Sequence, residues 1–217
     1  MFLGHFALGF AAKKIEPDVS LGTAFAATQL PDILWPVLIL TDLESVAIAP
    51  GDTAVTPLRF ESYPYSHSLL AVVLWGVVFA AIHFLDRRRG RAASLLALLV
   101  VSHWALDFVT HRPDMPLVPW NDRVLGLGLW RSVPATLAVE VLMFAAGVAL
   151  YGGATRGRDG VGRWGLVALV AFLLVAYAAN LFGPPPPSVA AVGLGGLLGA
   201  GLLLPWAVWV DRHRLRR

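Results

Sequence analysis

The stretch 92–114, AASLLALLVVSHWALDFVTHRPD, indicates both the class of fold and the place of the chemistry. Its larger part, Ala92–Val109, is almost continuously apolar and approaches the roughly 20 residues that a helix needs to cross a bilayer. His103, Asp107 and His111 follow one another at intervals of four. Such spacing keeps the three side chains on one stripe of an α-helix, which should end near His111 because Pro113 disfavours helix at the preceding residue.

Comparable apolar runs occupy most of the remaining sequence. Hydrophobic residues make up 57% of the 217 residues and charged residues only 14%, whereas soluble domains carry roughly 25% charged residues. This composition excludes a soluble enzyme, a nucleic-acid-binding protein and a disordered chain, and it predicts a polytopic membrane protein. The absence of cysteine excludes disulfides, thiolate metal sites and cysteine nucleophiles.

We therefore expect an all-α, polytopic membrane helix bundle with about six transmembrane helices. The expected spans are Leu21–Leu40, Ser68–Leu85, Ala92–Val109, Ser132–Tyr151, Trp164–Phe182 and Val189–Val210. The first is interrupted by Pro31, Asp32 and Pro36. The run Phe2–Ala12 is too short to span a bilayer at 1.5 Å per residue and is expected to form an N-terminal half-helix. Residues 1–217 should form a single integral membrane domain, with the motifs in 1–140 and generic spans in 141–217.

Lysine and arginine predict the orientation in the membrane. Most of the 17 basic residues fall in the segments Lys13–Lys14, Asp86–Arg91, Thr155–Arg163 and Asp211–Arg217. With six spans these segments share one side, so the basic loops and the C-terminus should be cytoplasmic. The loops Thr41–Ser66 and His111–Arg131 should face outward. We expect insertion into the inner (cytoplasmic) membrane of a bacterium without a cleaved signal peptide, since no basic region precedes the first apolar run.

Ionisable groups within a bilayer are costly, so their positions point to function. The candidates are His5, Asp32, His67, His103, Asp107, His111 and Glu140. On the predicted topology most of them lie in the outer half of the membrane. Imidazoles and carboxylates suit a divalent metal, with zinc the first choice and manganese and iron as alternatives. The ligands would be the first six residues, and Glu140 would serve as a catalytic base or an additional ligand.

Each candidate also has a structural interpretation. His103 and Asp107 alone would form an interhelical hydrogen-bonded pair. His67 would be an interfacial residue with Ser66 capping the next helix, and Glu140 would pair with Arg131 or an indole N–H. The acidic residues of the outer loops are expected to be solvated charges, with Asp114 best placed to approach the site. They are Asp42, Glu44, Asp52, Glu61, Asp114 and Asp122.

Four motifs carry a family resemblance over roughly residues 1–140. They are GHFALGFAAKK (4–14), QLPDILWP (29–36), SHSLL (66–70) and SHWALDFVTHRPD (102–114). They resemble the YdjM-like inner-membrane proteins, and the resemblance implies a membrane-bound metal-dependent hydrolase. The family pattern falls here on His5, Asp32, His67 and the pair His103 and Asp107. Many members carry an H-R-G-x-T-H-S stretch, but here residues 61–68 read ESYPYSHS, so the extra histidine is absent.

The sequence thus leaves three functions open. The first is a metal-dependent hydrolase acting on a phosphoester or an amphiphilic, lipid-linked substrate near the headgroups. The H-x3-D element is distantly similar to zinc-dependent phospholipase C enzymes. The second is a proton- or ion-coupled transporter or permease, which a proline-broken span at Asp32 also suits. The third is a non-catalytic structural membrane protein. Membrane lipid is the expected partner, no nucleic acid is expected, and no oligomeric state is indicated.

Overall fold

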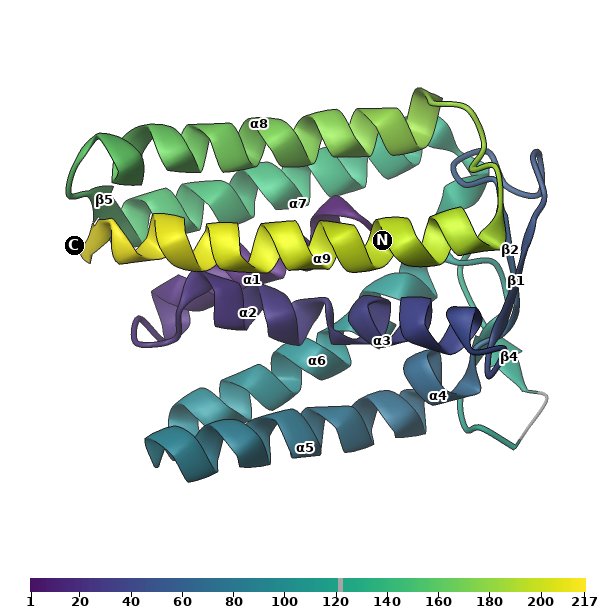
Figure 1. Cartoon of the computed structure of the whole chain (residues 1–217), viewed down its shortest axis with the longest axis horizontal. Helices are drawn as coiled ribbons and strands as arrows, with labels where there is room; N and C mark the ends of the chain where they lie inside the picture. The colour runs from purple at the N-terminus through teal and green to yellow at the C-terminus, as the bar shows by residue number, and fades with distance from the viewer. Residues whose placement is uncertain (121–122) are drawn as a thin grey trace.

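The computed structural model describes residues 1–120 and 123–217, so the expectation for Asp122 lies outside the described residues. It is a bundle of nearly aligned helices (Figure 1), which confirms the all-α membrane fold. The long helices are α5 (Leu69–Arg87), α6 (Gly90–Thr110), α7 (Val133–Ala154), α8 (Gly160–Phe182) and α9 (Val189–Arg212). The shorter ones are α1 (Leu3–Ile15), α2 (Leu21–Thr28), α3 (Leu30–Leu40), α4 (Pro64–His67) and the 3-10 turn η1 (Leu129–Arg131).

The number of spans agrees with the sequence. Within the described residues, α5 to α9 are each long and apolar enough to cross a membrane, and the bent pair of α2 and α3 brings the number to six if the pair is counted as one span. The two halves of this pair meet at Gln29 with a bend of 55°. Pro31 explains the break, because its ring removes an amide donor and clashes with the carbonyl of the residue four positions earlier. Pro36, in contrast, is accommodated inside α3.

The helix α1 begins in the middle of the bundle, where Figure 1 marks the N-terminus. It lies beside α2 and packs closely on α7. A Cβ atom on Gly147 of α7 would stand 2.4 Å from the backbone oxygen of Ala7. Around α1 the core is rich in aromatic rings, with Phe10 packed edge-on against Phe25, Phe144 and Tyr151. The expected N-terminal half-helix is therefore a central element of the bundle.

We expect Gly147→Leu to destabilise the fold by about 1–3 kcal/mol, because the added side chain forces α1 away from α7. Thermal unfolding in detergent measures the effect. Gly152→Leu is the matched control on the same helix, since a Cβ at Gly152 meets nothing within 4 Å among the described residues. Equal melting temperatures for the two variants would contradict this account of the α1–α7 contact.

Short two-stranded sheets, which the sequence analysis did not anticipate, close both ends of the bundle. At one end, here called the hairpin end, β1 (Ser45–Ile48) pairs with β2 (Leu58–Ser62), and β3 (Met115–Pro116) with β4 (Val124–Leu125). At the opposite end, the tail end, β5 (Thr155–Gly157) pairs with β6 (Arg214–Arg216) near the C-terminus. The expected basic loop and basic tail are therefore joined to each other.

Candidate metal centre

Helix α6 brings His103 and Asp107 into the bundle, as their spacing predicted. Their exposed fractions are 0% and 2%, and both lie in the half of α6 nearer the hairpin end. The Nε2 atom of His103 stands 3.1 Å from Asp107 Oδ2. The other oxygen, Oδ1, lies 3.1 Å from Nε2 of His5, which the N-terminal part of α1 contributes.

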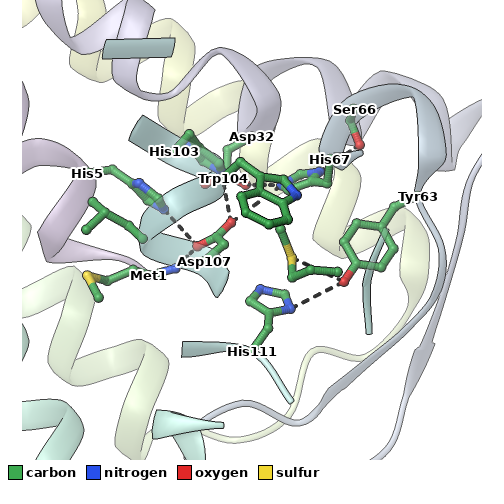
Figure 2. A network of polar contacts seen from close by, with 12 residues as sticks. Met1, His5, Asp32, Tyr63, Ser66, His67, His103, Trp104, Asp107 and His111 are labelled. Atoms are coloured by element: carbon green, nitrogen blue, oxygen red, sulfur yellow. Dashed lines mark hydrogen bonds and ion pairs between the residues drawn. The ribbon is translucent and has the colours of Figure 1, made fainter. Parts of the chain in front are cut away.

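Two further elements complete the cluster. Asp32 comes from the first turn of α3 and His67 from the end of α4. The Oδ1 atom of Asp32 is 3.4 Å from His67 Nε2 and 3.7 Å from His103 Nε2. Two groups of three possible metal ligands result, each with ligand atoms within 4.8 Å of one another. They are His5, His103 and Asp107, and Asp32, His67 and His103. His103 belongs to both, and Figure 2 shows the shared centre.

The hydrogen bond from His103 to the backbone fixes the tautomer of its neutral ring. Its Nδ1 atom lies 2.7 Å from the backbone oxygen of Thr28. A carbonyl only accepts hydrogen bonds, so Nδ1 carries the proton and donates it. In the neutral ring the lone pair is then on Nε2, which faces the carboxylates of Asp32 and Asp107. A lone pair that faces carboxylate oxygens is stabilised by a positive charge between or beside them, which a proton, an ammonium group or a metal ion can supply.

His67 is held in the same manner through a side-chain relay. Ser66 Oγ lies 2.5 Å from Glu44 Oε2 and 2.7 Å from His67 Nδ1. An ionised carboxylate only accepts, so the Ser66 hydroxyl donates to Glu44, and the ring of His67 donates from Nδ1 to Ser66. This leaves Nε2 of His67 directed at Asp32. Partners of this kind orient metal-bound histidines and set their tautomer.

The structure corrects the expectation that Glu44 is a solvated charge. Only 3% of the residue is exposed, and its carboxylate also accepts from the backbone N–H groups of Tyr65 at 2.7 Å and Ser66 at 2.8 Å. These bonds tie the loop after α3 to α4. Short-range sequence patterns carry no signal for them, because Glu44 is distant from Ser66 along the chain. Ser66 does not cap α5 either, since Ser68 accepts from Ala71 there.

We expect Ser66→Ala to weaken metal binding by about 10–100-fold, the usual effect of removing a partner that orients a ligand. The measurement is the zinc affinity of purified protein in competition with a chelator. Ser102→Ala is the matched control, because among the described residues the hydroxyl of Ser102 bonds to the backbone oxygen of Leu99 in its own helix and to no other group. If Ser66→Ala and Ser102→Ala bind zinc equally well, the relay does not orient His67.

His111 lies close to the centre but in neither of the two ligand groups. Its Nδ1 atom is 3.0 Å from Asp114 Oδ1, and its ring packs 4.4 Å from that of Trp130. The hydroxyl of Tyr63 donates to the same carboxylate oxygen at 2.8 Å (Figure 2 shows Tyr63 beside His111). Burial and the charge of Asp114 raise the pKa of Tyr63 well above its usual value, so this hydroxyl keeps its proton. Asp114 thus reaches His111 and not the centre itself.

Glu140 also lies outside both groups and binds the start of α1. Its Oε2 atom accepts from the backbone N–H of Leu3 at 2.6 Å, and its exposed fraction is 1%. The expected pairing with Arg131 or an indole is not the contact observed. Close by, the amino group of Met1 donates a hydrogen bond to Asp107 Oδ1 (Figure 2). The two oxygens of Asp107 therefore have different partners, since Oδ2 faces His103.

The fold and this centre define a class: a helical, multi-span membrane protein in which buried histidines and Asp107 meet the partly exposed Asp32 inside the bundle. The chain belongs to the family described as YdjM inner membrane protein, whose model matches residues 1–183. The match extends beyond the 1–140 of the motif resemblance and includes α7 and α8. No curated protein and no solved structure matches the chain. The family name places the protein in an inner membrane.

Proposed function

We propose that the chain is a membrane-bound, metal-dependent hydrolase. The proposed ligands are His5, Asp32, His67, His103 and Asp107. The observation that carries the proposal is the acceptor-rich centre, in which lone pairs of His103 and His67 face two carboxylates. A divalent cation bound at either group of three would satisfy the lone pair of His103 and the carboxylate that faces it, whereas a proton would have to be shared between these two groups.

Unpaired atoms around the centre support the fit. Among the described residues, the buried atoms without a hydrogen-bond partner include Nδ1 of His5 and Nε2 of His103, both on proposed ligands, and Oε1 of Glu140, which lies outside both ligand groups. Buried polar atoms are rarely left unpaired, because each costs about 1–3 kcal/mol. Mixed imidazole and carboxylate ligands suit zinc first, with manganese and iron as alternatives.

A bound metal would supply a Lewis acid that polarises an ester oxygen and lowers the pKa of water towards neutrality. The chain supplies the positioning. Thr28 and Ser66 hold the rings of His103 and His67. Glu140 is the proposed base, through the Oε1 atom that accepts no bond from α1. Hydrolysis adds water across the ester bond, and the proton that leaves the water ends on the departing oxygen.

The orientation is part of the proposal. If the basic loops are cytoplasmic, the tail end faces the cytoplasm and the hairpin end faces outward. The centre then lies in the outer half of the membrane, within reach of lipid headgroups. The proposed substrate is a phosphoester or an amphiphilic, lipid-linked molecule.

The test is the metal content of the detergent-purified protein, followed by hydrolysis assays on phosphoesters. We expect near-stoichiometric metal, and product formation that stops with a chelator and returns with zinc. Protein free of metal after purification and after zinc addition would overturn the proposal. The bent pair α2–α3 also suits a transporter. Substrate flux into proteoliposomes without product would favour that alternative.

A further inference from the structure

A cavity of about 500 Å³ leads away from the centre between α3, α8 and α9. Asp32, His67 and Asp107 line its polar end. The part between α8 and α9 is apolar and rich in glycine. It is lined by Phe172, Ala176, Gly195, Gly196, Gly199 and Leu203. The volume falls within the roughly 300–1,000 Å³ of ligand pockets, and the cavity is amphiphilic from one end to the other.

The spacing of α8 and α9 creates the apolar part. Towards the tail end the helices touch, since a Cβ on Gly165 would lie 3.1 Å from Val210, and the rings of Phe172 and Trp206 are 5.6 Å apart. Towards the hairpin end they separate, as Figure 1 shows. There a Cβ on Gly195 or Gly199 meets nothing within 4 Å among the described residues.

This opening lies on the lateral surface of the bundle. Both helices are apolar enough to span a membrane, and the rim residues Asn180, Gly195 and Gly196 are exposed. The medium around two spanning helices is hydrocarbon, not water. A chain that enters between them is therefore a lipid chain, and a water-soluble ligand has no comparable reason to occupy the apolar part.

We propose that this cavity holds one hydrocarbon chain of a membrane lipid whose phosphoester headgroup lies at the metal centre. The identity of the reacting bond rests on the proposed hydrolase function, whereas binding of the chain does not. The lipid enters sideways between α8 and α9 from the outer half of the bilayer.

The test uses phosphatidylglycerol with a photoactivatable group on one acyl chain, incorporated with the protein into lipid nanodiscs. We expect cross-links on the cavity-lining residues of α8 and α9, reduced at least about fivefold in Gly199→Leu, whose side chain fills the free space. Gly201→Leu is the matched control on the same helix. Gly201 is exposed and does not line the cavity, and a Cβ added there also meets nothing within 4 Å in the described part of the chain. Equal labelling of the two variants, or none at the cavity in wild type, would overturn the inference.

Measuring the cross-links in chelator-treated protein separates this inference from the hydrolase proposal. Labelling of the cavity without hydrolysis of any phosphoester supports lipid binding in the cavity and contradicts the proposed hydrolase function. Hydrolysis of p-nitrophenyl phosphate without labelling of the cavity supports the hydrolase function and contradicts lipid binding in the cavity. Metal content should be unaltered in Gly199→Leu. This control would show that the metal centre stays intact when a side chain fills the cavity.

Discussion

Replacing His103 with alanine is expected to remove nearly all bound metal. This loss is larger than the roughly 10–100-fold loss of metal affinity expected when a residue that only orients a ligand is replaced. His103 is the residue shared by both ligand groups, so its loss breaks them together. The double variant His103→Ala, Asp107→Ala should retain no metal. Mass spectrometry of metal content in detergent-purified protein gives the result directly.

His83→Ala is the control for this experiment, because His83 lies on α5 outside both groups. It should keep the wild-type metal content. Because alanine at a fully buried position also leaves a cavity, a second measurement guards against simple misfolding. Zinc should raise the melting temperature of wild type and of His83→Ala, since a ligand that binds only the folded state stabilises it. Wild-type metal content in a folded His103→Ala protein would exclude the proposed site.

Glu140 gives the second large effect, and two substitutions separate its roles. Glu140→Ala leaves the buried N–H of Leu3 without its acceptor, so we expect a loss of about 1–3 kcal/mol in the free energy of unfolding. Glu140→Gln keeps an acceptor oxygen for that N–H but removes the base. We expect Glu140→Gln to fold and bind metal while hydrolysis falls by about 10²–10⁴-fold.

Thermal unfolding, metal content and turnover are measured on both variants side by side. If Glu140→Gln hydrolyses substrate at the wild-type rate, Glu140 serves only to anchor α1. If both hydrolysis and metal content fall in Glu140→Gln, Glu140 is an additional ligand. The three measurements together therefore assign one role to this carboxylate.

The sequence predicted the spans and the pairing of His103 with Asp107, because apolar length and four-residue spacing are local properties of one helix. The four-residue spacing also placed His111 on the stripe of His103 and Asp107, but in the structure His111 is in neither ligand group. The helix α6 ends at Thr110, and His111 has extended backbone angles of φ −66° and ψ 148°. Beyond the last helical residue the spacing no longer fixes a direction, and the ring turns to Asp114.

Other features of the centre depend on contacts between distant segments. Glu44 reaches Ser66 only because the β1–β2 hairpin brings the two ends of the loop 41–66 together. The apolar part of the cavity depends on the angle between α8 and α9, and glycines within one helix do not reveal that angle. The motifs of the sequence therefore named all five of the proposed ligands, whereas the groups that orient them became visible only in three dimensions.

The break between α2 and α3 has a consequence for the backbone of the membrane interior. In an unbroken helix the carbonyl of Thr28 would accept a hydrogen bond from the amide four residues later. Pro31 interrupts that ladder, and the released oxygen instead accepts the ring proton of His103. A main-chain acceptor at this depth cannot be altered by changing the side chain of Thr28. The discontinuity thus provides the centre with a permanent anchor that point substitutions at residue 28 do not remove.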